Sequence, residues 1–168
     1  MDGGVSFTRT IPGMKRTGPG ADGGRAAREA VVREHMASEN RQDFDATIAT
    51  FDHPRYELVG TGQVFDGEEE VRGYFAASRA AFPDQHNEIH SMRHADDAVV
   101  VEFDLIGTHL GDFAGFAPTG REFRCRMAAI FELSGDRIVC ERVYFDSATI
   151  LRQLGLVGAP SPGSEKPT

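Results

Sequence analysis

An arginine, a tyrosine and an aspartate alternate along residues 137–146, a segment with the pattern of a strand. Side chains two residues apart on a strand share a face, so Arg142, Tyr144 and Asp146 should point the same way. A carboxyl held beside Tyr144 and Met127 of a neighbouring strand loses hydration. That loss raises its pKa towards neutrality, where a proton-transfer group works best. The pattern therefore predicts Asp146 as a general base in a pocket.

The neighbours of this carboxyl have several possible roles. Tyr144 and Arg142 could polarise a carbonyl or bind an oxyanion or carboxylate. Arg142 could instead pair with Asp146, and Asp146 could simply cap the helix that follows at Ser147. His109 could be a second acid/base because histidine titrates near neutral pH, although a loop histidine more often faces solvent. Each pair of alternatives stays open on sequence alone.

The register of the last two strands follows from a predicted two-residue hairpin loop, Gly135-Asp136. Antiparallel counting then sets Met127 opposite Tyr144, and Phe131 opposite Cys140. The more apolar face of this hairpin should line the cavity, together with Phe103 of the preceding strand. The predicted inner face carries Phe123, Cys125, Met127, Ala129, Phe131, Leu133, Ile138, Cys140, Arg142, Tyr144 and Asp146. Its two cysteines are about 20 Å apart in this register, so both should be free thiols.

Other polar and aromatic residues are candidates for the same pocket. Asn87 shares a strand face with Gln85, and a buried amide there could bind a carbonyl. Phe113 and Phe116 lie in a glycine-rich loop that is either a hydrophobic lid or part of the core. The histidines of the Asn87 strand would lie on its exposed outer face, which is a poor metal site, so no metal is predicted.

Composition narrows the class of protein. The chain has 168 residues and a formal net charge of −8, with no basic run in its body, which argues against nucleic acid as a partner. Its longest apolar runs are too short to cross a bilayer, and the N-terminus lacks the apolar segment of a secretory signal. Two cysteines indicate a reducing compartment, so we expect a cytoplasmic protein.

The chain should form one domain over residues 25–157. Residues 1–24 and 158–168 are rich in Gly and Pro and are predicted to be a disordered or tag-like extension and a flexible tail. The predicted helices span 25–41, 43–51, 68–81 and 147–154. The predicted strands span 56–59, 63–65, 87–94, 99–109, 123–133 and 137–146. Helices that come first and strands that follow favour an α+β fold, with helices on one face of an antiparallel sheet.

Several short motifs, in this order and spacing, resemble a known family. They are Phe82-Pro83-Asp84, GTHLG at 107–111, PTGR at 118–121, GDRIV at 135–139, YFD at 144–146 and LRQLGL at 151–156. Together they are similar to the SnoaL-like branch of the nuclear transport factor 2-like superfamily, over residues 26–157. The resemblance implies a cone-shaped fold, in which helices pack on the concave face of a curved antiparallel sheet around one pocket. Asp146 matches the aspartate that acts as acid/base in SnoaL-type cyclases.

The resemblance also implies a range of activities, because this branch includes aldol-type polyketide cyclases and ester cyclases. We expect a cofactor-independent acid/base enzyme of secondary metabolism, such as antibiotic biosynthesis. It would be a cyclase, isomerase or dehydratase (lyase) acting on a hydrophobic, carbonyl-bearing small molecule. The alternative is a non-catalytic binding or dimerisation module of the same fold. A homodimer is expected through the outer sheet face, where the predicted apolar residues are Val143, Phe145, Ile106 and Val100.

Overall fold

The computed structural model describes residues 19–158, with side chains from residue 23 onward. Residues 1–18 of the predicted N-terminal extension, and 159–168 of the predicted tail, lie outside the described residues. The first helix, α1 (Pro19–Arg41), begins at Pro19 instead of Arg25, so residues 19–24 do not belong to a disordered extension. The other predicted elements are all present, most of them within two residues of the predicted bounds.

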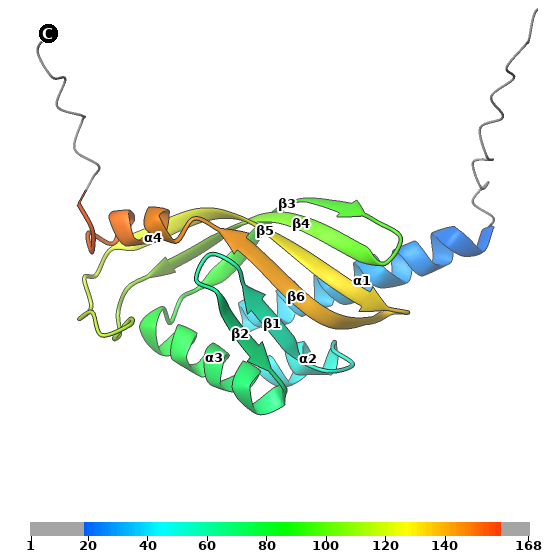
Figure 1. The fold of residues 1–168 in the computed structure, drawn as a ribbon, viewed down its shortest axis with the longest axis horizontal. Coiled ribbons are helices and arrows are strands. Elements are labelled where there is room, and N and C mark those ends of the chain that lie inside the picture. The colour runs from blue at the N-terminus through cyan, green and yellow to red at the C-terminus, as the bar shows by residue number, and fades with distance from the viewer. Residues whose placement is uncertain (1–18, 159–168) are drawn as a thin grey trace, which may run out of the picture.

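A six-stranded sheet forms the body of the protein, and its strands run in the order β2-β1-β6-β5-β4-β3 (Figure 1). Neighbouring strands are antiparallel except β1 and β6, which are parallel. The four long strands lie side by side, and the short β1–β2 hairpin extends the sheet beyond β6. The strands are β1 (Arg55–Leu58), β2 (Gln63–Asp66), β3 (His86–His94), β4 (Ala98–Thr108), β5 (Glu122–Ser134) and β6 (Arg137–Phe145).

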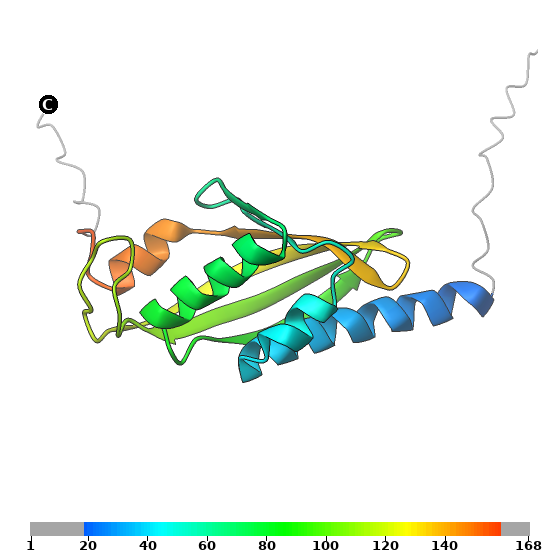
Figure 2. The same cartoon turned by 90° about the horizontal axis from the view of Figure 1, so that it is seen from below.

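Three helices cover one face of this sheet: α1, α2 (Phe44–Ala49) and α3 (Glu68–Ala81) (Figure 2). A short helix, α4 (Ser147–Gln153), follows β6 at the end of the sheet. The curved sheet with helices on one face confirms the predicted α+β class. No described helix is long and apolar enough to cross a membrane. A cavity lies between α3 and the inner face of the sheet.

Local signals in the sequence account for most helix ends. Asp43 caps α2 by accepting a hydrogen bond from the Ala46 amide at 3.2 Å. Helix α3 occupies the predicted range and carries glutamates in its first turn, where negative charge stabilises the helix dipole. The alternative that Asp146 caps the closing helix is confirmed for α4. Asp146 is the cap, and its carboxylate accepts from the Ala148 amide at 3.0 Å.

The hairpin between β5 and β6 has the predicted turn but not the predicted register. Ser134 lies opposite Arg137, as a two-residue loop requires. A bulge then follows, so Glu132 pairs with Cys140, and Val139 is left as an extra residue on β6. One extra residue exchanges the two faces of a strand for every position beyond it. From residue 140 onward, the inward-facing side chains of β6 are therefore those predicted to face outward.

This exchange also changes the predicted outer face. Val143 and Phe145 line the internal cavity instead of forming an exposed apolar patch, so their placement on a dimer interface is wrong. Ile106 is 5% exposed, which leaves little apolar surface there as well. The homodimer itself stays a prediction. Both cysteines are free, as predicted, although Cys140 lies on the outer face beside Glu57 and not on the face of Cys125.

Candidate active site

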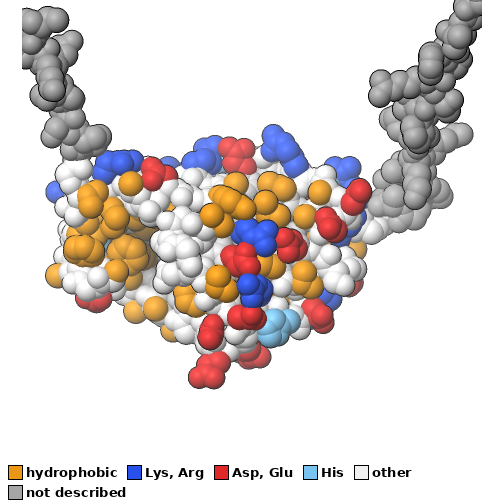
Figure 3. Space-filling model, viewed as in Figure 1, with side chains coloured by type: hydrophobic (Ala, Val, Ile, Leu, Met, Phe, Trp, Pro, Cys, Tyr) orange, Lys and Arg blue, Asp and Glu red, His pale blue; other side chains and the backbone are white. Residues whose placement is uncertain are grey.

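A large cavity lies between the inner face of the sheet and helices α3 and α4, with a volume of about 1050 Å³. Figure 3 shows hydrophobic side chains gathered at the end of the molecule where α3, α4 and the loop after β4 meet. Most of the wall is apolar, and a cavity of this size accommodates a molecule with several rings. Its apolar wall includes Leu58, Tyr74, Phe75, Phe82, Phe103, Leu105, Phe113, Phe116, Phe123, Met127, Val143, Phe145, Ile150 and Leu151.

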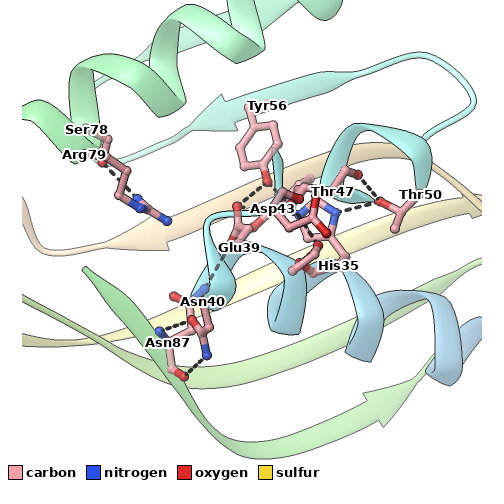
Figure 4. Close-up of polar contacts among 12 residues, drawn as sticks. His35, Glu39, Asn40, Asp43, Thr47, Thr50, Tyr56, Ser78, Arg79 and Asn87 are labelled. Carbon is pink, nitrogen blue, oxygen red and sulfur yellow. Dashed lines mark hydrogen bonds and ion pairs between the residues drawn. The ribbon is translucent and has the colours of Figure 1, made fainter. Parts of the chain in front are cut away.

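One region of the wall is polar and contains two carboxyl groups. Glu39 of α1, Glu141 of β6 and Tyr56 of β1 all line the cavity. Figure 4 shows the Tyr56 hydroxyl pointing towards the Glu39 carboxylate. The Tyr56 hydroxyl lies 2.7 Å from Glu39 Oε1, and the amide of Asn87 donates to Glu39 Oε2 at 2.9 Å. All four side chains are buried. A buried carboxylate pair beside an apolar cavity is an arrangement that suits acid/base chemistry.

His35 lies behind this polar region and is completely buried. Its Nε2 is 3.0 Å from Glu141 Oε2 and 2.6 Å from the Tyr56 hydroxyl. On the other side of the ring, Nδ1 lies 2.8 Å from Thr50 Oγ1. Thr50 already donates its own proton to the Thr47 carbonyl, so His35 Nδ1 is the donor to Thr50. The Thr50 contact therefore fixes a proton on Nδ1 and turns Nε2 towards the carboxyl groups.

Burial and mutual contacts set the charges in this cluster. Burial opposes protonation of His35, but its hydrogen bond to Glu141 and its ion-pair contact with Glu39 at 3.7 Å raise its pKa to about 9. Burial would raise the pKa of Glu39, yet the contacts with His35 outweigh it and hold that pKa below its usual range. Burial raises the pKa of Glu141 in spite of its hydrogen bond to His35. The two glutamates thus differ, and Glu141 is the one that holds a proton more readily.

The hydrogen bonds explain this difference between the glutamates. Glu39 accepts from Tyr56 and Asn87, so both of its oxygens have donors. Glu141 receives the His35 proton on Oε2. Burial and the nearby carboxylates raise the pKa of Tyr56 well above 10, so its hydroxyl remains a donor. Glu39 is therefore a fixed carboxylate that orients Tyr56 and Asn87, whereas Glu141 is free to exchange a proton with a molecule in the cavity.

The ligand atoms of His35, Glu39 and Glu141 lie within 4.8 Å of one another, close enough to surround a metal ion. One imidazole and two carboxylates are a ligand set that Zn²⁺ accepts. These groups already have hydrogen-bond partners among the described residues. His35 contacts Tyr56 and Glu141, and Glu39 accepts from Tyr56 and Asn87. A proton shared between imidazole and carboxylate therefore satisfies the cluster, and we treat it as a proton-transfer site.

Five of the predicted pocket residues do line the cavity. They are Asn87, Met127, Phe103, Phe113 and Phe116. Asn87 binds the Glu39 carboxylate, which gives the buried amide the polar partner that it needs. The rings of Phe113 and Phe82 meet edge to face at 5.0 Å, and Phe116 is 43% exposed. The loop that carries these two phenylalanines is thus a lid that contacts the cavity from its outer end.

Two further predicted residues are buried but do not border the cavity. Phe131 packs edge to face against His35 at 5.4 Å, so it supports the cluster from the core. His109 is not solvent-facing: it is fully buried and packs against Phe82 at 5.5 Å. Its Nδ1 accepts from the Thr119 amide, which ties the two ends of the lid loop together. The structure therefore supports a positioning role for His109 and does not place it against a substrate.

The predicted group of Asp146, Tyr144 and Arg142 is not in the cavity. The Asp146 side chain is 60% exposed at the N-terminus of α4. Its hydrogen bond from the Thr149 hydroxyl holds its pKa below the usual range, the opposite of the predicted shift. Tyr144 is 43% exposed, and Arg142 pairs with Glu57 and Glu132 on the outer face. The bulge in β6 is the physical reason, because it reverses the face of residues 140–145.

The sequence did contain a signal for the residues that were missed. Val32, His35, Met36 and Glu39 follow the spacing of one helical face, and all four are buried. A stripe drawn through Ala27, Ala30, Val31 and Ala37 instead leaves His35 and Glu39 outside the predicted apolar face. A histidine and a glutamate four residues apart, within a stripe that also holds valine and methionine, indicate buried polar chemistry.

The sequence profile described as SnoaL-like polyketide cyclase matches residues 29–154. This range includes His35, Glu39, Tyr56 and Glu141, the whole polar cluster. No curated protein sequence matches the chain.

Solved structures of the same shape come from several bacteria. IdmH from Streptomyces antibioticus, a proposed polyketide cyclase, is 26% identical with a TM-score of 0.67, over 76% of this chain and 98% of that one. A proposed SnoaL-like polyketide cyclase from Jannaschia sp. CCS1 is 20% identical with a TM-score of 0.72, over 87% and 100%. TsrD from Streptomyces laurentii is 21% identical with a TM-score of 0.69, over 79% and 98%. The last two support the fold alone.

Proposed function

The chain belongs to the SnoaL-like polyketide cyclase family, and from that premise we propose that it is a cofactor-independent carbon-acid enzyme. It removes a proton beside a carbonyl group and returns it elsewhere on the same molecule. The substrate is a hydrophobic, multi-ring or ring-forming carbonyl compound. Among the reactions open to this family we favour intramolecular aldol cyclisation, as a step of secondary metabolism.

The observation that carries this proposal is the Glu39–Tyr56–His35–Glu141 network at the wall of an apolar cavity. A weakly acidic C–H next to a carbonyl needs a base whose pKa has been raised by burial. Glu141 meets that requirement, because it is 4% exposed and burial raises its pKa. The surrounding apolar wall keeps water away from the enolate that would form.

Each residue of the network has a distinct part in the proposed reaction. The Glu141 carboxylate takes the proton, and the electron pair of the broken C–H bond becomes an enolate. Tyr74 lines the cavity, and burial raises the pKa of its hydroxyl, so this hydroxyl stays protonated and can donate to the enolate oxygen. The enolate carbon then attacks a second carbonyl, and the protonated Glu141 returns its proton to the new alkoxide.

His35 and Glu39 act through their neighbours. The His35 imidazolium offers positive charge to Glu141 at 3.0 Å and so limits how far burial raises the pKa of that carboxyl. Glu39 holds the Tyr56 hydroxyl at 2.7 Å and thereby fixes the oxygen that lies next to His35. This arrangement keeps a single exchangeable proton near Glu141, which is what reversible proton transfer at a carbon requires.

Deuterium exchange of β-tetralone, a bicyclic ketone with an acidic CH₂ group, tests the proposal. The wild-type protein in D₂O should accelerate loss of this CH₂ signal in proton NMR, with saturation at high ketone concentration. Leu105→Trp, which fills the cavity from β4, should lose both binding and exchange. Saturable binding of the ketone without any acceleration of exchange would instead favour the non-catalytic binding module.

A further inference from the structure

Arg79 of α3 is the one Lys or Arg side chain, among the described residues, that lines the cavity. Figure 4 shows its side chain leaving α3 towards the region of Glu39 and Asn87. The atom Nε is buried without a hydrogen-bond partner, and Nη1 donates only to the Ser78 hydroxyl at 3.3 Å. A guanidinium has five N–H donors, so most of this group is available to a ligand.

The charge of Arg79 is not neutralised by an acidic neighbour. Among the described residues, no carboxylate lies within ion-pair distance of its guanidinium, and its near contact is the Phe44 ring at 5.5 Å. Arg72, two turns earlier on the same helix, is by contrast paired with both Glu68 and Asp45. Glu39 is close enough for Arg79 to lower its pKa, but Tyr56 and Asn87 already bind that carboxylate.

A second donor lies beside the arginine. The Ser78 hydroxyl donates to Gln85 Oε1 at 2.7 Å, which leaves the Gln85 amide nitrogen with its donors unused. Gln85 is 6% exposed and lines the cavity, so its side chain is largely shielded from bulk water and lies at the cavity wall. The chain of contacts from Arg79 to Ser78 to Gln85 therefore joins a free cation to a free amide donor in one part of the wall.

We propose that Arg79 and Gln85 form an anion subsite that selects substrates carrying a carboxylate on a hydrophobic ring system. A guanidinium and an amide N–H₂ group are donors that match the oxygens of a carboxylate. The proposal rests on the proposed function only in placing the substrate in this cavity. It adds that the substrate carries, besides its reacting carbonyl groups, a free carboxylate instead of a neutral ester or amide, and that this carboxylate lies at the α3 side of the cavity.

Equilibrium binding of two ligands of the same shape tests this selection. The probes are anthraquinone β-carboxylate and anthraquinone β-carboxamide, titrated into the full chain and followed by protein fluorescence. The wild type should bind the carboxylate about tenfold or more tightly than the carboxamide, and added salt should reduce the difference. Arg79→Gln should remove the preference, and Arg79→Lys should keep part of it. Arg72→Gln, a matched change on the same helix, should leave the preference intact.

A second variant tests the subsite without replacing Arg79, in case Arg79→Gln does not fold. Gln85→Glu puts a carboxylate of the same size beside Arg79 and should abolish carboxylate selection by neutralising the guanidinium. Equal binding of the two probes to the wild type, or no binding of either, would overturn the anion subsite. A preference that survives both Arg79→Gln and Gln85→Glu would overturn it as well. These measurements need no turnover, so a failure here is separate from a failure of β-tetralone exchange.

Discussion

His35 Nε2 and Glu141 Oε2 lie 3.0 Å apart although 106 residues separate them in the chain. The contact joins the first helix to the last strand across the interior of the protein. It depends on the bulge at Val139, which turns Glu141 inward and Arg142 outward. The same contact that ties α1 to the sheet also affects the protonation of the proposed base. Both the stability and the activity of the protein should therefore depend on His35 and Glu141.

Stability should fall as the pH rises through the titration of His35. Its pKa is raised from 6.5 to about 9, so protonation stabilises the folded protein. A group with a raised pKa contributes fully below its unfolded value and loses that contribution as the pH passes its folded value. The melting temperature should therefore decrease between pH 6.5 and about 9. His35→Gln should be less stable throughout and should lack this decrease, and a similar decrease in His35→Gln would contradict the assignment.

Removing the Tyr56 hydroxyl should lower the unfolding free energy of the protein. Tyr56→Phe keeps the ring packing against Phe75 but takes away the hydrogen bond to Glu39 at 2.7 Å. Leaving a buried carboxylate short of a donor costs about 1–3 kcal/mol of unfolding free energy, measurable by urea denaturation. Tyr74→Phe is the control, because Tyr74 lines the cavity outside the hydrogen-bond network of Glu39. A cost no larger than that of Tyr74→Phe would show that the network adds nothing to stability.

Two glycine-to-alanine changes should have opposite effects on stability. A Cβ at Gly111 would meet the carbonyl oxygen of Ala80, where the lid loop is bound to the end of α3. Gly111→Ala should therefore cost about 1–3 kcal/mol and loosen the lid. A Cβ at Gly73 of α3 meets nothing within 4 Å, so Gly73→Ala should gain about 0.5–1 kcal/mol from helix propensity. The melting temperatures of both variants measure these effects. A change of the same sign in both variants would contradict the close approach of Gly111 to the Ala80 carbonyl.

The sequence predicted the elements of this fold better than the faces of its strands. Helix α3 and the Gly135-Asp136 turn follow from local capping and turn chemistry, which act over a few residues. The bulge at Val139 has no such local cause in the sequence, because Ile138 and Val139 are both acceptable inward residues. Because the predicted register lacks this extra residue, it places Arg142 and Tyr144 in the site, where the structure has Glu141. Phe103 on β4 and Met127 on β5 were placed correctly in the cavity wall, whereas Phe131 of β5 packs behind it against His35.

The most direct test of the proposed base compares two carboxyl groups, Glu141 within β6 and Asp146 directly after it. Glu141→Gln and Asp146→Asn each exchange a carboxylate for an amide of the same shape. Asp146 is an exposed helix cap, and asparagine caps nearly as well, so Asp146→Asn should fold normally with a cost of about 1 kcal/mol or less. Circular dichroism on both variants would establish that each is folded.

The measurement is the rate of β-tetralone deuterium exchange catalysed by these two variants beside the wild type. Glu141→Gln should lower the catalysed rate by about 10²–10⁴-fold, the usual contribution of a positioned base. Asp146→Asn should keep the rate within a few-fold of the wild type. The reverse pattern, in which Asp146→Asn loses exchange and folded Glu141→Gln retains it, would contradict the assignment of proton transfer to Glu141.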